Sequence, residues 1–173
     1  MNRKEAGFTL IELVITMAIL SILLSLALPS FQGVLARQRV SSAIHLLSTD
    51  MAMARSTAVM RREAVVVCPL GADGTCGTDS DWGAGWMVFR DPDGNREPDE
   101  QSRILRLTDA PASGRLTLSS TRGFLRYQPD GRAAHSNLTV RVCADGLLAG
   151  KVVVNNLGRV RSERPRPAVC PES

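Results

Sequence analysis

The chain has 173 residues and a formal net charge of +4, which allow one domain and at most one appendage and exclude a large multidomain assembly. The charge is unevenly placed: nine acidic residues and four arginines lie in residues 73–109, whereas five basic residues and one glutamate lie in residues 151–166. A domain with an acidic end and a basic end can meet a polyanion through one end only.

Residues 8–28 form an apolar stretch whose only charged residue is Glu12. As a helix this stretch would extend about 31 Å, at ~1.5 Å per residue, which is enough to cross a bilayer. It runs into Pro29 rather than into the small-residue cleavage site of a secretory signal peptide, so we predict that it remains as a membrane anchor. A carboxylate inside a bilayer costs on the order of 3 kcal/mol, and we therefore expect Glu12 to have a cationic partner.

The junction before this stretch reads Gly-Phe-Thr-Leu-Ile-Glu at residues 7–12 and follows a short basic leader. It resembles the class III signal of type IV pilins and type II secretion pseudopilins. The resemblance implies that prepilin peptidase removes residues 1–7 by cleaving after Gly7, and that the new amine of Phe8 is N-methylated. It also implies that Glu12 pairs with the Phe8 amine of a neighbouring pilin. The protein would then cross the bacterial inner membrane once, with its head in the periplasm, before joining an extracellular pilus.

A second helical pattern covers residues 29–62. Apolar residues follow a three-four spacing, with charged residues off that stripe, which predicts an amphipathic continuation of the anchor helix lying against a globular head. The stripe consists of Val40, Ile44, Leu47, Met51, Ala54 and Ala58, and the charged residues off it are Arg37, Arg39, Asp50 and Arg55. Pro29 is expected to kink or loosen this helix locally, and His45 is interpreted as a residue at the edge of the stripe.

Residues 63–173 read as a β-rich head, because short β-branched and aromatic runs alternate with turn residues. The predicted strands cover residues 64–68, 85–90, 104–107, 116–119, 124–128, 138–143, 151–155 and 159–162. Asparagine and glycine in residues 155–158 tolerate positive φ, so this segment is predicted to be a hairpin turn. The fold class is therefore α+β, with one long N-terminal helix packed on a mainly antiparallel β head, as in type IV pilins.

The four cysteines allow three disulfide pairings. Cys68 and Cys76 enclose a short glycine-containing loop, which suits a local bridge, and Cys143 and Cys170 would then pair. A metal site is the alternative, but no Cys-x-x-Cys spacing exists and the two histidines are isolated in the sequence. Disulfides imply an oxidising compartment.

The head also resembles a narrower family. Residues 82–89, 91–95, 104–106 and 152–161 are similar to segments of the FimT/GspH group of minor pilins and pseudopilins. Pilins of the FimT type and pseudopilins of the GspH type share nearly all of these features, and the anchor does not separate them.

Catalysis is not indicated, because no nucleophile–base grouping and no known catalytic motif is present, and we predict neither an enzyme nor a cofactor. The turn at residues 91–95, followed by Asp99 and Glu100, has oxygen-bearing side chains at alternate positions, as a calcium site would. Its glycine is misplaced for an EF-hand, and we interpret it as an acidic turn that binds no metal.

The segment with the strongest functional signal is residues 157–170, which are rich in arginine. If it is extended, Arg159 and Arg161 point to the same face about 6.6 Å apart, a spacing that can serve two phosphates of one nucleic-acid strand. Two prolines hold Arg164 and Arg166 in an extended run, and a bridge at Cys170 would restrain it. Arginine suits phosphate because its planar fork can bind two oxygens.

Gly158, Arg159 and Arg161 also match the Gly-Arg-x-Arg element that the resemblance associates with DNA capture in FimT-type pilins, and Lys151 joins them on charge geometry. We therefore predict a minor type IV pilin that binds extracellular DNA non-specifically for uptake during natural transformation. The alternatives are a structural minor pilin that primes pilus assembly, a GspH-like pseudopilin of a type II secretion system whose arginines are merely solvated, and a head that binds a protein through residues 73–109.

Overall fold

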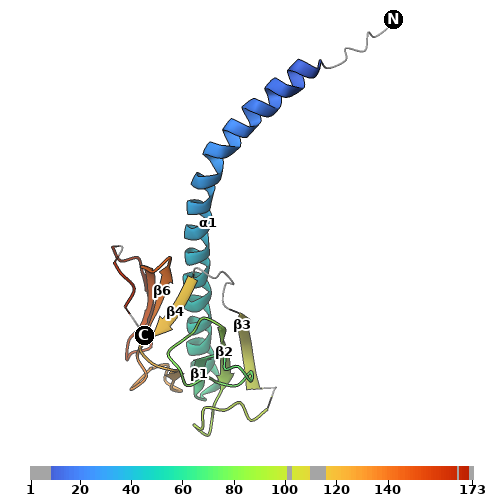
Figure 1. The fold of residues 1–173 in the computed structure, drawn as a ribbon. Coiled ribbons are helices and arrows are strands. Elements are labelled where there is room, and N and C mark those ends of the chain that lie inside the picture. Colours follow the sequence, from blue (N-terminus) through green and yellow to red (C-terminus); the bar gives the residue numbers. More distant parts are fainter. Residues whose placement is uncertain (1–8, 101–102, 110–115, 167, 172–173) are drawn as a thin grey trace, which may run out of the picture. The chain divides into compact units, whose positions relative to one another are not determined.

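The computed structural model describes residues 9–100, 103–109, 116–166 and 168–171, without the side chains of residues 26–30 and 32. It contains one helix and eight strands in these ranges (Figure 1), namely α1 (Leu10–Arg61), β1 (Val65–Pro69), β2 (Gly85–Arg90), β3 (Ile104–Asp109), β4 (Leu116–Ser120), β5 (Leu125–Tyr127), β6 (Leu138–Ala144), β7 (Leu147–Val154) and β8 (Val160–Glu163). The chain forms two compact units, Met1–Gln38 and Arg39–Ser173.

In the first unit, α1 exposes a continuous series of large apolar side chains, from Leu10 to Leu24 and again at Phe31, Val34 and Leu35. Within the described residues, however, no helical window combines the length and the hydropathy that a membrane span requires. The predicted anchor at residues 8–28 lies partly outside the described residues and stays a prediction. The side chain of Pro29 also lies outside them, although the backbone of α1 is helical on both sides of it.

In the second unit, the amphipathic prediction for α1 is confirmed. Every residue of the predicted stripe is buried, from Val40 (7% exposed) to Ala58 (0%). Asp50 corrects the prediction, because it was placed off the stripe and yet its side chain is fully buried. All buried residues of both hydrophobic clusters lie within Arg39–Ser173, so this unit carries its own core. We expect it to fold without the part of α1 that precedes Arg39.

The strands form two antiparallel sheets, in the orders β3-β2-β1-β5 and β4-β6-β7-β8. In the first sheet all of β1 is buried, because Val65 and Val67 face the helix while Val66 and Cys68 belong to a second apolar cluster on the other side. In the second sheet, burial alternates along β6 and β7, so one face meets the core and the other meets solvent.

The predicted strands match the observed ones closely, apart from β7. That strand begins at Leu147, four residues earlier than predicted, because Asp145 and Gly146 make a two-residue turn from β6 with φ of 51° and 77°. Asp-Gly is a preferred pair for such a turn, so a usable signal was present in the sequence.

Both disulfides are present, Cys68–Cys76 and Cys143–Cys170, with Cα–Cα distances of 5.7 and 6.1 Å. They agree with the pairing expected from the sequence. The first closes the loop after β1, and the second ties the C-terminal segment to β6.

Candidate nucleic-acid interface

The turn between β7 and β8 depends on Gly158. Its amide donates a hydrogen bond to the carbonyl of Asn155 at 2.8 Å, and its φ is +74°, a conformation that side chains with a Cβ rarely adopt. A Cβ at this position would collide with the carbonyl oxygen of Gly131. Glycine is therefore required here by the packing of the turn, and it sets the direction in which Arg159 leaves it.

Arg55 of α1 fixes the same turn from the helix side. Its Nε donates to the carbonyl of Gly131 at 3.0 Å, and its Nη2 donates to the carbonyl of Leu157 at 3.2 Å. These two bonds join the helix to the two loops that meet at Gly158. The sequence placed Arg55 on the polar side of α1, but the pattern alone carried no sign of this contact.

The solvent face of the second sheet carries a cluster of basic side chains. The register places Arg141 beside Lys151, and Lys151 beside Glu163. The carboxylate of Glu163 forms ion pairs with Lys151 Nζ at 3.2 Å and with Arg161 Nε at 3.1 Å. Two cations thus share one carboxylate, and the Arg161 side chain remains 66% exposed.

Arg141 was missed in the sequence analysis. It sits in the run Thr139-Val140-Arg141-Val142, whose alternation puts Val140 and Val142 in the core and Arg141 on the outside. That alternation, together with the pairing of the two neighbouring strands, was the available signal. Within the described residues Arg141 forms no ion pair, so it adds a positive charge to this face.

Arg159 lies in a different setting from Arg161. It precedes β8, its amide donates to Asn155 Oδ1 at 2.9 Å, and it borders a groove of about 430 Å³ that α1 lines with Ala52, Arg55, Ser56, Val59 and Met60. Arg161 instead belongs to the face that carries Lys151 and Glu163. The two arginines are both exposed, and Arg159 directly precedes β8, which starts at Val160.

The C-terminal segment is held against the head. The Cys143–Cys170 bridge is supported by backbone hydrogen bonds from Leu148 to Ala168 at 2.8 Å and from Cys170 to Gly146 at 2.9 Å. Arg166 is exposed and has no ion pair among the described residues, whereas Arg164 donates from Nη2 to Ser41 Oγ of α1 at 3.2 Å. Arg164 therefore turns toward the helix rather than outward.

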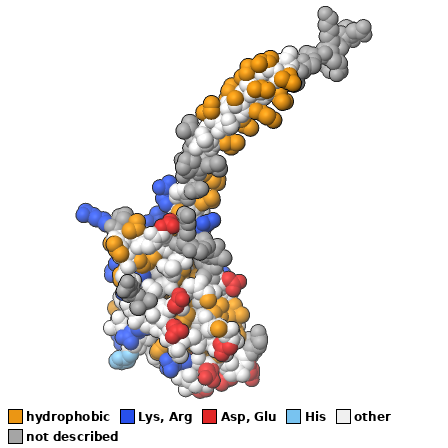
Figure 2. Space-filling view, in the orientation of Figure 1, with side chains coloured by type: hydrophobic (Ala, Val, Ile, Leu, Met, Phe, Trp, Pro, Cys, Tyr) orange, Lys and Arg blue, Asp and Glu red, His pale blue; other side chains and the backbone are white. Residues whose placement is uncertain are grey.

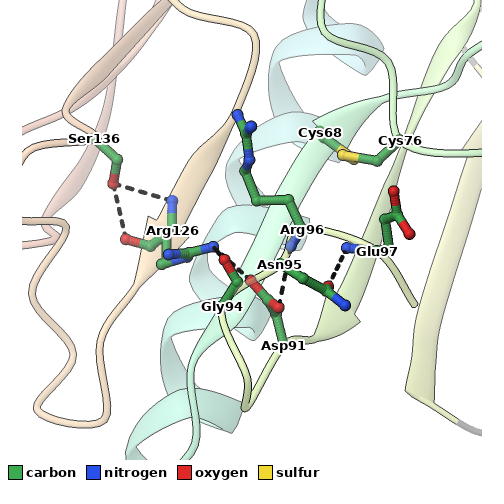
Figure 3. A network of polar contacts seen from close by, with 9 residues as sticks. All are labelled: Cys68, Cys76, Asp91, Gly94, Asn95, Arg96, Glu97, Arg126 and Ser136. Atoms are coloured by element: carbon green, nitrogen blue, oxygen red, sulfur yellow. Dashed lines mark hydrogen bonds and ion pairs between the residues drawn. A yellow bond between two sulfur atoms is a disulfide. The ribbon is translucent and has the colours of Figure 1, made fainter. Parts of the chain in front are cut away.

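The acidic turn after β2 is a structural element. Asp91 is fully buried, and its carboxylate binds Arg126 Nη2 at 2.7 Å and accepts the amide of Arg96 at 3.2 Å, as Figure 3 shows. Arg126 also donates to the carbonyl of Gly94 at 2.8 Å, which closes the turn. No cluster of three metal-ligating side chains occurs in the described residues, and the interpretation as a turn explains the order of these side chains.

The surface around the turn that follows β2 is acidic. The exposed acidic residues in the loops of the first sheet are Asp73, Asp79, Asp81, Asp93, Glu97, Asp99 and Glu100, and acidic side chains gather on the face drawn in Figure 2. Hydrogen bonds from the hydroxyl and the amide of Thr75 lower the pKa of Asp73, so this carboxylate stays charged. DNA would be repelled from this region.

At the N-terminus, Gly7 and Phe8 lie outside the described residues. Glu12 occupies the first turn of α1, where its amide donates to Thr9 Oγ1 at 3.3 Å. Thr9 thus caps the helix, and a glutamate three residues after such a cap is favourable at the positive end of the helix dipole. This gives Glu12 a local role in addition to the intersubunit role expected of it.

Comparison with known proteins places the chain in a family. A family model described as type II transport protein GspH matches residues 43–158, and one described as the prokaryotic N-terminal methylation motif matches residues 2–28. The chain belongs to the GspH family. It carries the N-terminal methylation motif and has the type IV pilin fold.

Curated relatives are similar in part. The type IV major fimbrial protein FimA of Dichelobacter nodosus is 36% identical over 85 residues, which is 49% of this chain and 54% of that protein. The type IV major pilin PilE1 of Neisseria gonorrhoeae is 54% identical over 46 residues, 27% of this chain and 28% of that protein. The chain thus spans about half, or less, of the length of these relatives.

A solved structure supports the fold. The crystal structure of the type IV minor pilin FimU of Pseudomonas aeruginosa superposes with a TM-score of 0.59 and 20% identity, over 76% of this chain and 96% of that one.

Proposed function

We propose that this chain is a minor type IV pilin that binds extracellular DNA non-specifically, through phosphate contacts from the β7–β8 hairpin and the C-terminal segment, and that it serves DNA uptake in natural transformation. The observation that carries the proposal is the excess of positive charge on this part of the head, where Lys151 and Arg161 share Glu163 while Arg159 and Arg166 have no ion pair among the described residues. Arg159, Arg161, Lys151, Arg164 and Arg166 are the proposed DNA-binding residues, and Gly158 shapes the turn.

The restraint of the segment supports this role. Arg55, the Cys143–Cys170 bridge and the backbone bonds near Ala168 hold the arginine-bearing chain in place before any ligand arrives. A preorganised segment loses less conformational entropy on binding. Binding should be electrostatic and indifferent to base sequence, with no catalysis and no cofactor.

The N-terminal segment would bring the head to the cell surface as part of a pilus. The methylation motif supports an inner-membrane-anchored precursor that becomes part of a pilus. We propose cleavage after Gly7 by prepilin peptidase, methylation of Phe8 and pairing of Glu12 with the Phe8 amine of a neighbouring pilin. Several heads that meet one DNA polymer would add avidity to a weak single site.

The test is the salt dependence of binding. The oxidised head, residues 34–173, is titrated into labelled duplex DNA between about 50 and 200 mM salt. With roughly four phosphate contacts, log K should fall with log salt at a slope of about −3 to −4, and the double variant Arg159→Ala, Arg161→Ala should lose about two units of that slope. Absence of binding by the wild type at the lowest salt, or an equal slope for the double variant, contradicts the proposal.

A structural role is the second candidate, because the family model carries the description of a type II transport protein and the fold matches a minor pilin. In that case the chain would prime assembly of a pilus, or sit in a secretion pseudopilus, without binding DNA. Deleting the gene would then abolish pilus assembly or secretion, and restoring the arginine double variant would rescue it fully.

A further inference from the structure

A second polar recess lies between α1 and the edge strand β8. It has a volume of about 440 Å³ and is lined by Ser41, Ile44, His45, Ser48, Ser162 and Arg164. All of these residues belong to the Arg39–Ser173 unit. The recess is separate from the groove that Arg159 borders, whose lining shares none of these residues.

The polar side chains that line this recess are basic or hydroxyl-bearing. The lining offers a guanidinium, an imidazole and three hydroxyls, and no carboxylate is among the lining residues that the structure describes. Guanidinium and hydroxyl groups can all donate to an anion, and an arginine fork matches two oxygens of one phosphate. Among the described lining residues only Ile44 is apolar, and it is 8% exposed and forms part of the core beneath.

The side chain of Ser48 is a further hydrogen-bonding group in the lining of this recess. Its hydroxyl oxygen is buried and has no hydrogen-bond partner among the described residues. A hydroxyl without a protein partner can still donate a hydrogen bond, so Ser48 adds a donor to the wall of the recess.

The position of Arg164 follows from β8. Val160 and Ser162 pair with the buried residues Val154 and Val152, and each lines one of the two hollows beside α1. Arg164 directly follows the end of β8 at Glu163 and lines the same recess as Ser162. The hydrogen bond from Arg164 Nη2 to Ser41 Oγ at 3.2 Å holds the guanidinium at the recess and leaves its other N–H groups available.

We infer that this recess binds a phosphate group, held by the guanidinium of Arg164 and by the hydroxyls of Ser41, Ser48 and Ser162, with His45 at its rim. Resting on the proposed function, the inference assigns this phosphate to the bound DNA. Arg161 and Arg164 are three residues apart, about 10 Å in an extended chain, so one DNA strand can contact Arg161 on the outer face and place a further phosphate in the recess.

The test uses inorganic phosphate as the probe and the oxidised head, residues 34–173, observed by NMR through its backbone amide signals. Phosphate should give saturable shifts at His45, Ser48 and Ser162, while chloride at equal ionic strength should not. Arg164→Gln should weaken phosphate binding at least tenfold. Arg103→Gln is the matched control: it removes the same charge beside the first sheet, outside the recess, and should change phosphate binding less than twofold. Ser48→Ala, which leaves the net charge unchanged, should weaken it severalfold.

A second arm adds short duplex DNA to the phosphate-saturated head. Displacement of phosphate by DNA supports the assigned source, and displacement that is lost in Arg164→Gln supports it further. DNA that binds without displacing phosphate overturns the assignment and leaves a site for free phosphate. Phosphate that binds to a head without affinity for DNA overturns the proposed function but not the recess. Shifts that do not saturate, or that are equal in Arg164→Gln and Arg103→Gln, identify an adventitious ion only and overturn the inference, whatever the DNA affinity is.

Discussion

The two sheets of the head use charge in opposite ways. In the first sheet, basic side chains are matched by individual acidic partners, in the pairs Arg106–Asp50, Arg126–Asp91, Arg90–Glu63 and Arg103–Asp99. Two of the carboxylates, Asp50 and Asp91, are completely buried. In the second sheet, two cations share Glu163, and Arg141 is unpaired within the described residues.

The difference shows which charges are available to a ligand. A charge that is buried and paired contributes to the fold, and removing its partner leaves a desolvated group behind. An exposed cation in excess contributes little to stability and remains free to bind an anion. Variants in the first sheet should therefore change stability, and variants in the second should change binding.

The largest effect is expected for Asp50→Ala. Asp50 pairs with Arg106 Nε at 3.1 Å and accepts hydrogen bonds from Trp86 Nε1 at 2.9 Å and Thr108 Oγ1 at 2.7 Å. Truncation leaves the buried indole without an acceptor and should cost about 3 kcal/mol of unfolding free energy. Thermal unfolding should show a Tm lower by about 10 °C. The exposed carboxylate of Asp79 is the control, and the unfolding free energy of Asp79→Asn should stay within about 0.5 kcal/mol of the wild type. Equal losses of stability in Asp50→Ala and Asp79→Asn would contradict a structural role for the buried carboxylate.

The second-largest effect is expected for Gly158→Ala. It combines a left-handed backbone conformation with a clash against the Gly131 carbonyl, and we expect a loss of about 2–3 kcal/mol together with weaker DNA binding. Gly146 has a similar φ of +77° but no atom near its missing Cβ, so Gly146→Ala should cost only about 1 kcal/mol. Chemical denaturation measures both. A Gly158→Ala head as stable as the Gly146→Ala head would refute the close packing of the hairpin turn.

Glu163→Gln should strengthen DNA binding. The carboxylate neutralises part of Lys151 and Arg161, and its removal frees both side chains without deleting a cation. We expect affinity to rise about three- to tenfold at low salt, with little change in stability because the pairs are partly exposed. Glu97→Gln, in the acidic loops, changes net charge equally and should have a smaller effect. Weaker binding by Glu163→Gln would count against the basic face.

The smallest effect concerns Tyr127 of β5, the single tyrosine of the chain. Burial raises the pKa of its phenol well above the ordinary value near 10, so the folded head keeps the phenol protonated where the unfolded chain ionises it. Stability from this group is complete below about pH 10 and declines as the pH rises further. Phenolate absorbance should therefore appear together with unfolding; titration near pH 10 in an intact head would contradict the burial.

Much of this fold follows from local sequence patterns. The stripe of α1, the strand positions and the turn at residues 155–158 were predicted because each depends on periodicity or on turn residues close together in the chain. Asp50 could not be recognised as buried, because its partners Trp86 and Arg106 are distant in the sequence. The contacts of Arg55, the place of Arg141 and the recess at Arg164 likewise depend on which strands and loops meet, which a single sequence does not specify.

The most direct measurement compares two double variants that remove the same charge. Arg159→Ala with Arg161→Ala removes two cations from the hairpin, and Arg90→Ala with Arg103→Ala removes two from the first sheet, where each has its own carboxylate. In one titration of labelled DNA at low salt, the first variant should bind at least tenfold more weakly than the wild type, and the second should stay within about twofold. Equal losses in both variants would mean that net charge alone governs binding, and would contradict a DNA-binding site on the hairpin.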